Sequence, residues 1–371
     1  MKIYIDHGTF TDWKGTPHGI QRVIASIGDE IKKLHKETES IIFDENLSCF
    51  NFDVKKRLLI NKITPEDGGI IFKAGSDWDK PDYEEQLNFC KKFNLRIVPF
   101  FHDIIPMILP YSYGPGFYPI YEKWFKDTLL VSDLAFSNSQ NTKTDIIKYS
   151  NEQKLKCPEI IPIRLGDNEF SFNNSFPENF PFEKGTPFLL SVGTVEYRKN
   201  HAFLLNLYRY IKDLDLYEMP KLIIVGKTGW LDQNIKHQIS NDHRLFNKIK
   251  ILEGISDEEL SYLYQNCLFT LYPSLYEGWG LPIAESLNFN KPCIASSNSS
   301  MNEISSLVDY CDPFNIKQWS EKIKSYVENP SLREKKCEEI KLTYKTTLWS
   351  ETANCIFNTL LKFYPELSKK L

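Results

Sequence analysis

The stretch Glu277-Gly278-Trp279-Gly280-Leu281-Pro282-Ile283-Ala284-Glu285 decides how this chain of 371 residues is interpreted. A short apolar strand is expected before it, at Leu268–Leu271. A helix is expected to begin at Pro282, because a proline at the first helical position loses no hydrogen bond. A strand, a glycine turn and a helix in this order are typical of α/β domains, in which ligands bind beyond the carboxyl ends of the strands.

The chemistry of this stretch favours a ligand with phosphates at its centre and hydroxyl groups at both ends. Gly278 and Gly280 let the backbone approach a ligand closely, and the free N–H groups and dipole of the helix start attract anions. Glu277 and Glu285 flank that anion site, and each carboxylate can accept two hydroxyl hydrogens. A nucleotide sugar has this arrangement of groups. The alternative is an ordinary helix start with two solvated glutamates.

Apolar runs that predict buried parallel strands recur along the chain, and each is followed by a helical pattern. They form two sets: Lys2–Asp6, Ile41–Phe43, Gly69–Phe72, Arg96–Phe101 and Leu134–Ser137, and then Phe188–Val192, Lys221–Val225, Ile249–Leu252, Leu268–Leu271 and Cys293–Ala295. The sequence therefore predicts two doubly wound, Rossmann-like α/β domains that face a central cleft.

The domain boundary is predicted from composition. Residues 1–170 form the expected first domain, with Ile160–Ile163 as its last strand, and residues 188–349 form the second. Residues 171–187 are rich in Asn, Pro and Phe without periodicity, which is typical of a linker. A C-terminal helix within residues 350–371 is expected either to pack on the second domain or to cross back onto the first.

Composition excludes several classes of protein. The net charge is −4, so the surface as a whole does not favour nucleic-acid binding, and no apolar run approaches the roughly 20 residues that span a bilayer. The eight cysteines form no CxxC pair and no metal-ligand spacing with a histidine, so we expect reduced, mostly buried thiols in a cytoplasmic protein. GxGxxG, P-loop and GxSxG sequences are absent, which leaves dehydrogenases, NTPases and α/β-hydrolases unsupported.

Two further motifs follow predicted strands. In Ser191–His201, the adjacent cations Arg198 and Lys199 suit a diphosphate; a solvated basic pair at a helix start is the alternative. In Phe100-Phe101-His102-Asp103, the histidine ends a strand and is expected to face the cleft, with Asp103 orienting the imidazole. A hydrogen-bonded core histidine is the alternative.

Two weaker signals lie in the first half of the chain. The polar loop Gly8–Gly19 precedes an amphipathic helix, and its His18 and Gly19, with Arg22 just beyond, are candidates for contact with an acceptor. The stretch Tyr111–Phe125 is unusually aromatic. It either rests on a membrane surface or packs as a loop and helix of the first domain.

These motifs together resemble the retaining GT-B glycosyltransferases of family 4, in order and over nearly the whole chain. Further stretches that match are Val131–Ser139, Gly254–Leu260 and Asp312–Phe314. The segments His18–Val23 and Val225–Trp230 resemble more closely the bacterial mannosyltransferases of O-antigen and capsule assembly. One departure is Thr194, where many family members carry a basic residue, and this leaves open how Arg198 and Lys199 share the phosphate contacts.

The resemblance implies a role for each candidate residue. Catalysis would involve Glu277 beside the donor sugar, His102 over that sugar, and Arg198 and Lys199 on the diphosphate. The donor site implied by the family comprises Gly193, Lys227, Ile255, Gly278, Trp279, Gly280, Leu281 and Glu285, with the ribose on Glu285 and the base beside the loop at Gly254 and Ile255. His18, Gly19 and Arg22 would lie on the acceptor side, and no metal or cofactor is implied.

The resemblance also implies an activity: transfer of a hexose, mannose from GDP-mannose above all, onto a glycan or a lipid-linked saccharide, with the anomeric configuration retained. Its partners would be the nucleotide sugar and that acceptor, with peripheral contact at the inner face of the cell membrane and no nucleic acid. The alternatives are a UDP-hexose donor on the same fold, a nucleotide-sugar epimerase, and a nucleotide-sugar-binding protein without transferase activity.

Overall fold

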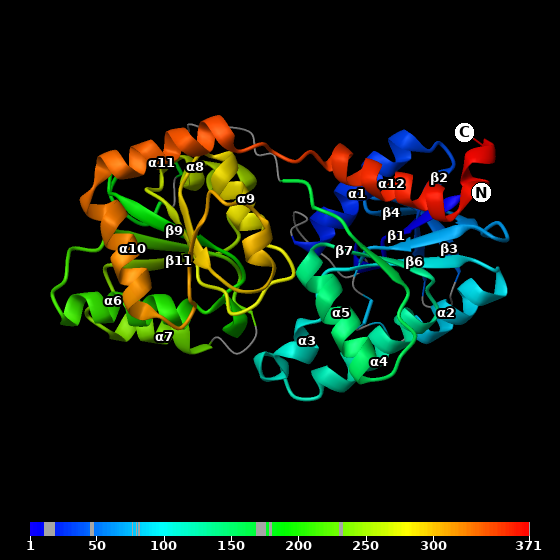
Figure 1. Cartoon of the computed structure of the whole chain (residues 1–371), viewed down its shortest axis with the longest axis horizontal. Coiled ribbons are helices and arrows are strands. Elements are labelled where there is room, and N and C mark those ends of the chain that lie inside the picture. The colour runs from blue at the N-terminus through cyan, green and yellow to red at the C-terminus, as the bar shows by residue number, and fades with distance from the viewer. Residues whose placement is uncertain are drawn as a thin grey trace. The chain divides into compact units, whose positions relative to one another are not determined.

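A computed structural model describes residues 1–10, 19–44, 48–75, 77–78, 80, 82–167, 176–177, 180–229 and 233–370. The chain divides into two compact α/β units. The first contains Met1–Pro110, Pro115–Gly166 and Thr347–Leu371, and the second contains Tyr111–Gly114 and Asp167–Thr346. Each unit is a sheet with helices packed against its faces (Figure 1). The expected alternation of strands and helices in two Rossmann-like α/β units is thereby confirmed.

The first unit is built mainly from the first 166 residues. Its elements in chain order are β1 (Ile3–Asp6), η1 (Gly8–Phe10), α1 (Ile20–Leu34), β2 (Thr38–Phe43), β3 (Cys49–Asp53), β4 (Leu58–Ile63), β5 (Ile70–Lys73), α2 (Tyr83–Lys92), β6 (Arg96–Phe101), α3 (Ile105–Ile108), η2 (Pro110–Ser112, which ends in the second unit's segment), α4 (Phe117–Leu130), β7 (Leu134–Ser137), α5 (Gln140–Glu152), β8 (Glu159–Pro162), α12 (Trp349–Phe363) and η5 (Pro365–Lys370).

Among the described residues, the sheet of this unit has eight strands in the order β4-β3-β2-β1-β5-β6-β7-β8. The six strands β2, β1, β5, β6, β7 and β8 run parallel to one another. At the edge next to β2, β3 and β4 form an antiparallel hairpin. The sequence analysis named no strand in this hairpin. The parallel strands are apolar runs because both of their faces are covered, but β4 is exposed along most of its length and lacks that signature.

The C-terminal helix α12 belongs to the first unit. Its apolar face, with Ala353, Ile356 and Leu360 buried, packs against α1. Trp349, the first residue of α12, packs closely against Gly166: a Cβ on Gly166 would lie 2.5 Å from the Trp349 ring. Thr352 Oγ1 also donates a hydrogen bond to the carbonyl of Arg164, at 2.8 Å. Of the two placements that the sequence left open, the structure has the crossing back to the first unit.

A buried ion cluster lies at the carboxyl ends of β1 and β5. Lys73 Nζ is 2.6 Å from a carboxylate oxygen of Asp6 and 2.6 Å from one of Asp77, and the Lys73 side chain is only 6% exposed. Trp124 Nε1 donates to the other oxygen of Asp77. Burial lowers the pKa of Lys73, but the two carboxylates outweigh it and raise that pKa above its ordinary value, so the ammonium stays charged.

Replacing Lys73 by Met should lower the free energy of unfolding by about 3–5 kcal/mol, because two buried carboxylates lose their shared cation. Urea unfolding measures this loss, and Lys91→Met, at an exposed position on α2, serves as the matched control. A Lys73→Met protein as stable as the control would show that the cluster does not hold these strand ends.

The second unit is built mainly from Asp167–Thr346. Its elements are β9 (Phe188–Val192), η3 (Tyr197–Lys199), α6 (His201–Asp213), β10 (Lys221–Val225), α7 (Gln233–Asn241), β11 (Ile249–Leu252), α8 (Asp257–Asn266), β12 (Thr270–Tyr272), α9 (Leu281–Asn288), β13 (Cys293–Ser296), η4 (Ser299–Glu303), β14 (Asp309–Cys311), α10 (Ile316–Glu328) and α11 (Pro330–Thr343).

Six parallel strands form the described part of this sheet, in the order β11-β10-β9-β12-β13-β14. The order reverses between β9 and β12, which are the first and fourth strands of the unit. Loops that leave such a pair at their carboxyl ends diverge to opposite sides of the sheet and leave room for a ligand. The sequence analysis placed the strand before the glycine turn at Leu268–Leu271, whereas β12 begins at Thr270, and it did not anticipate β14.

Three expectations from the composition can be compared with the residues that the structure describes. All eight cysteines lie among them, none is disulfide-bonded, and most are buried. No helix in this part of the chain combines the length and the apolar character needed to cross a bilayer. The aromatic stretch Tyr111–Phe125 contributes Tyr121, Trp124 and Phe125 to the core of the first unit. These three residues therefore pack inside the unit, as one of the two alternatives predicted.

Candidate active site

The candidate site of the second unit lies at the carboxyl ends of β9 and β12. The loop after β9 carries Arg198 and Lys199, and the loop after β12 carries Glu277. Hydrogen bonds to backbone carbonyls join these loops: Leu275 N donates to the Arg198 carbonyl at 2.7 Å, and Asn200 Nδ2 donates to the Pro273 carbonyl at 3.1 Å. Two motifs about eighty residues apart in sequence are therefore one structural feature.

Glu277 is the centre of a buried ion cluster. One of its carboxylate oxygens accepts a hydrogen bond from Arg198 Nη1 at 2.6 Å, and the other lies 2.6 Å from Lys199 Nζ. Arg198 Nε also pairs with Glu196 at 2.7 Å. The Glu277 side chain is 7% exposed and that of Lys199 11%. The positive charges of Arg198 and Lys199 thus equal in number the negative charges of Glu196 and Glu277.

The cluster fixes the charge of its central carboxylate. Burial alone would raise the pKa of Glu277, but Arg198 and Lys199 outweigh it and lower that pKa to about 2. Burial also lowers the pKa of Lys199, with Arg198 adding to the effect and Glu277 opposing it. At neutral pH the glutamate is therefore an anion that holds two cations in fixed positions.

Two neighbours shape the position of Lys199. Its Nζ donates to the Tyr272 hydroxyl at 2.8 Å and lies 5.0 Å from the centre of that ring. Gly193, which has a φ of 152°, lies against its aliphatic stem, because a Cβ there would be 3.4 Å from Lys199 Cε. A Cβ on Gly226 would lie 2.0 Å from the Gly193 carbonyl, so the ends of β9 and β10 meet only because residue 226 is a glycine.

The glycine turn after Glu277 is held from the other side by η4. Ser299 Oγ accepts a hydrogen bond from Glu277 N at 3.0 Å, and Ser300 Oγ donates to the Glu277 carbonyl at 2.7 Å. The helix α9 then begins at Leu281, so Pro282 occupies the second helical position and not the first as the sequence suggested. Pro282 has no N–H, and Ile283 N donates to the Gly280 carbonyl at 2.9 Å, so this helix start offers an anion its dipole and the Leu281 N–H.

Glu285 differs from Glu277 in its surroundings. It lies in α9, is 5% exposed, and accepts a hydrogen bond from the Tyr264 hydroxyl at 2.7 Å. Tyr264 is itself stacked on Phe289, with ring centres 5.2 Å apart. The two glutamates of the motif are therefore not equivalent: one is held by cations and the other by a phenol.

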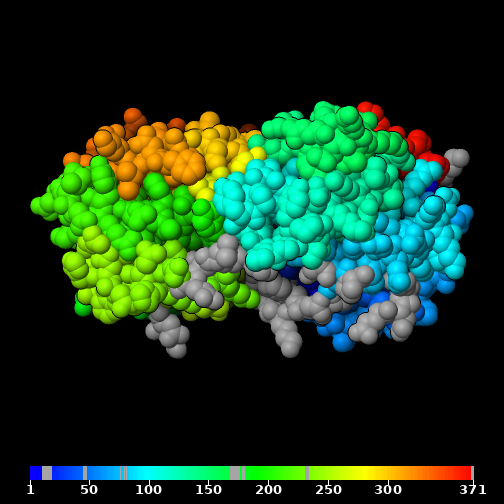
Figure 2. All heavy atoms as spheres, turned by 90° about the horizontal axis from the view of Figure 1, so that it is seen from below, coloured from blue at the N-terminus to red at the C-terminus, as the bar shows by residue number. Residues whose placement is uncertain are grey.

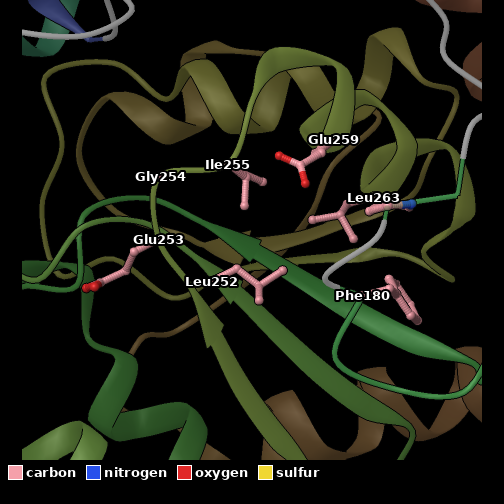
Figure 3. Close-up of a pocket in the computed structure, with 8 residues that line it drawn as sticks. Phe180, Leu252, Glu253, Gly254, Ile255, Glu259 and Leu263 are labelled. Carbon is pink, nitrogen blue, oxygen red and sulfur yellow. The ribbon is translucent and has the colours of Figure 1, made fainter.

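A cavity of about 130 Å³ lies at the carboxyl end of β11. Phe180, Leu252, Ile255 and Leu263 form its apolar walls, with Gly254 and Glu259 beside them (Figure 3). In this view the Glu253 carboxylate points away from Leu252 and Ile255, whereas that of Glu259 lies near Ile255. Ile255, a predicted donor-site residue, is thus part of a pocket with apolar walls and a carboxylate.

The remaining donor-site candidates of this unit lie around these features. Trp279 and Gly280 are buried in the glycine turn, and a Cβ on Gly280 would lie 2.9 Å from Ile304. Lys227 is exposed just beyond β10, and its carbonyl accepts a hydrogen bond from Val195 N at 2.8 Å.

In the first unit, His102 lies at the end of β6. Its Nε2 donates to the Ala74 carbonyl at 2.7 Å, which leaves Nδ1 as the acceptor nitrogen of a neutral ring. Burial lowers the pKa of His102 to about 4, despite the opposing effect of that hydrogen bond. The Ala74 carbonyl holds Nε2 of the imidazole, and the Asp103 carboxylate accepts the Ile105 N–H at 2.9 Å, so the orienting role of Asp103 stays a prediction.

The acceptor-side candidates are described in part. Gly19 precedes α1 with a φ of 54°, and Arg22 lies in the first turn of that helix, partly buried. His18 lies outside the described residues, as do residues 171–175, 178 and 179 of the predicted linker.

Sequence reasoning missed three residues of the site. Glu196 pairs with Arg198, Tyr272 contacts Lys199, and Tyr264 bonds to Glu285. Glu196 lies within the quoted motif, so its position two residues before Arg198 was an available signal. The tyrosines carried none, because a tyrosine ending a strand or inside a helix is ordinary in any core.

Comparison with known proteins agrees with this geometry. Residues 173–342 match the family described as glycosyl transferases group 1. The chain is 28% identical over 270 residues to O-antigen chain mannosyltransferase B of Escherichia coli, which covers 69% of each protein. It is 29% identical over 268 residues to O-antigen chain mannosyltransferase RfbU of Salmonella typhimurium strain LT2, covering 68% of this chain and 71% of the relative.

Solved structures share the fold at low identity. Sucrose-phosphate synthase from Thermosynechococcus elongatus superposes with a TM-score of 0.69 at 14% identity, covering 98% of this chain and 99% of the other. WaaG, a glycosyltransferase involved in lipopolysaccharide biosynthesis, gives 0.68 at 14% identity, with 95% and 99% covered. Anabaena HepE in complex with UDP-glucose gives 0.67 at 14% identity, with 98% and 100% covered.

The second unit is therefore a domain of glycosyl transferases group 1, and the protein is a glycosyltransferase with the GT-B fold. Within that class the chain is homologous to the O-antigen mannosyltransferases of enteric bacteria.

Replacing Glu277 by Gln should lower the free energy of unfolding by about 3 kcal/mol or more, because Arg198 and Lys199 lose their shared anion. The folded-state pKa of about 2 lies below the ordinary 4.5. The stabilisation is therefore complete above pH 4.5 and lost as pH falls towards 2. Urea unfolding from neutral to acid pH measures both effects, and Glu334→Gln, at an exposed position on α11, is the control. Equal stability of the two variants would contradict the cluster's structural role.

Proposed function

We propose that this protein is a retaining mannosyltransferase that uses GDP-mannose and extends a glycan or a lipid-linked saccharide in the synthesis of a surface polysaccharide such as O-antigen or capsule. The observation that carries the proposal is the cluster of Glu277, Arg198 and Lys199 beside the start of α9. The names of the homologous mannosyltransferases support the sugar, and placement in family 4 is part of the same proposal.

The cluster suits the departure of a nucleoside diphosphate. Negative charge grows on the phosphates as the bond from the anomeric carbon to the diphosphate oxygen breaks, and fixed cations with helix N–H groups lower the free energy of that state. Arg198 and Lys199 are already held in place by Glu277, so little reorganisation is required. The donor binding of HepE, a protein of the same fold with UDP-glucose bound, agrees with a nucleotide sugar as the substrate.

The acceptor hydroxyl would then attack the anomeric carbon from the side that the diphosphate leaves, and its proton would pass to the departing phosphate oxygen. This sequence retains the anomeric configuration without a covalent enzyme intermediate. Glu277 would lie beside the sugar, Glu285 would hold the ribose hydroxyls, and the glycine turn with Leu281 would contact sugar and phosphates. In this proposal His102 has the catalytic role that the family resemblance implies. Gly19 and Arg22 lie on the acceptor side, as the same resemblance implies.

The pocket at Ile255 favours guanine as the base. A carboxylate can accept two parallel hydrogen bonds from the ring N–H and amino group of guanine, whereas uracil offers one N–H between two carbonyl oxygens. Glu259 is the carboxylate at this pocket. One of its oxygens accepts the Ser256 N–H at 2.8 Å, and this hydrogen bond holds the carboxylate in place. Lys227, exposed beyond β10, completes the proposed donor site.

We also propose that the reaction needs no metal ion, because Arg198 and Lys199 supply the positive charge at the leaving group. The proposed setting is the cytoplasm, with peripheral contact at the inner face of the membrane where a lipid-linked acceptor would lie. Turnover that persists in excess chelator agrees with this view, and turnover that is restored only by a divalent cation contradicts it.

Lys199→Ala should reduce kcat by about 10²–10³-fold, the loss typical when one group that stabilises transition-state charge is removed. Glu277 keeps Arg198 as its partner in this variant, so the fold should persist, and thermal unfolding checks that it does. The change Glu277→Gln should reduce kcat more than it raises the KM for the donor. Near-normal turnover of Lys199→Ala would exclude its role at the diphosphate.

The donor is tested by a panel of GDP- and UDP-sugars, with nucleotide release measured with and without candidate acceptors. We expect GDP-mannose to react fastest and the product to keep the α-configuration of the donor by NMR. Faster release from a UDP-hexose would identify the alternative donor. A changed sugar without transfer would indicate an epimerase, and binding without release a nucleotide-sugar-binding protein.

A further inference from the structure

The hairpin of β3 and β4 presents an apolar surface that the described part of the first unit leaves uncovered. Leu58, Leu59 and Ile60 are 58%, 50% and 65% exposed, although they are consecutive residues of a strand. The strand is ordered by pairing with β3, with Phe52 opposite Leu59, and by a hydrogen bond from Asn51 Nδ2 to Asn61 Oδ1 at 3.4 Å. β4 is the terminal strand of the sheet in the described residues.

Basic residues surround this apolar surface. The turn of the hairpin carries Lys55, Lys56 and Arg57, and Lys62 follows the apolar residues. Asp53, which lies 3.9 Å from Lys56 Nζ, is the acidic residue of the same segment, so residues 53–63 carry a net charge of +3 in a chain whose net charge is −4. This part of the chain, mid-blue in the colour bar, reaches the surface of the first unit (Figure 2).

We propose that the β3–β4 hairpin docks on an anionic lipid bilayer, with Leu58, Leu59 and Ile60 in the interfacial layer and the lysines on the headgroups. Side chains of consecutive strand residues point to opposite faces, so both faces of β4 are apolar and exposed. A lipid interface surrounds an inserted segment on every side, whereas a protein partner covers one face. Three strand residues span about 10 Å, which suits shallow insertion.

Charge complementarity selects this occupant over a second copy of the chain. Pairing two β4 strands edge to edge would bring the lysines of one hairpin against those of the other, an arrangement that like charges oppose. An anionic headgroup layer instead attracts each cation, and the long lysine stems let the ammonium groups stay at the headgroups while the apolar residues lie deeper. Shallow insertion also keeps the open strand edge within reach of water and headgroup hydrogen bonds.

This inference rests on the proposed peripheral membrane contact and assigns it to named residues, but it does not depend on the donor. None of these residues is part of the proposed catalytic or donor-binding machinery. Turnover on a water-soluble acceptor should therefore be the same with and without changes in the hairpin.

The test is co-sedimentation of the whole protein with vesicles of phosphatidylcholine, with and without added phosphatidylglycerol. We expect binding to the anionic vesicles and little to the neutral ones. The triple change Lys55→Gln, Lys56→Gln, Lys62→Gln should weaken binding by about fivefold per lysine, on the order of a hundredfold in all. The triple change Leu58→Ser, Leu59→Ser, Ile60→Ser should weaken it at least about tenfold.

Two controls remove charge or apolar area at exposed positions of the second unit: Lys317→Gln, Lys324→Gln, Lys335→Gln, equal in number to the lysine changes, and Phe314→Ser, Leu342→Ser, at two strongly exposed apolar residues. Both should bind vesicles within about twofold of the wild type, since screened charges away from the contact contribute little. Thermal unfolding and turnover on the soluble acceptor confirm that every variant is folded.

Other results with the vesicles, or in light scattering, overturn the inference. Absence of binding to anionic vesicles removes the membrane contact altogether. Binding that the hairpin variants leave unchanged, or that the controls weaken equally, places the contact elsewhere. A dimer in light scattering that the apolar triple change dissociates, without an effect on vesicle binding, identifies the hairpin as an interface between copies. Failure of the donor panel alone would overturn the proposed reaction and leave the vesicle result standing.

Discussion

The buried carboxylate of Glu277, paired with Arg198 and Lys199, is the interaction on which the second unit's site depends. Two adjacent cations would repel each other at the end of a strand, and burial makes that repulsion stronger. Glu277 neutralises this repulsion and joins the loop after β9 to the loop after β12. The same contact that stabilises the strand ends therefore holds two cations ready for an anionic leaving group.

The backbone makes this contact feasible. Gly226 lets the ends of β9 and β10 meet, because a Cβ there would lie 2.0 Å from the Gly193 carbonyl, and Gly193 lies against the stem of Lys199. The serines of η4 hold the turn after Glu277 from the opposite side. The two glutamates of the opening motif are consequently held in different ways, Glu277 by cations and Glu285 by Tyr264, which agrees with different roles at the two ends of one donor.

Much of the fold could be predicted from the sequence, because parallel strands with both faces covered appear as uninterrupted apolar runs, as in Phe188–Val192 and Lys221–Val225. The hairpin β3–β4 was not predicted, because its short apolar run Leu58–Ile60 lies between basic and polar residues and is exposed on both faces, unlike the buried runs of the parallel strands. The motifs predicted which residues gather at strand ends. They did not predict that Arg198 binds Glu277, because pairing across 79 residues is set by the order of strands in the sheet.

A crystal structure of the protein with GDP-mannose, or with GDP alone, is the most direct test of the central claim that this cluster receives the diphosphate. The account predicts phosphate oxygens within hydrogen-bond distance of Arg198, Lys199 and the Leu281 N–H at the start of α9, with the ribose hydroxyls on Glu285 and the base against Ile255. A diphosphate bound elsewhere, with Arg198 and Lys199 contacting only Glu277, would contradict it.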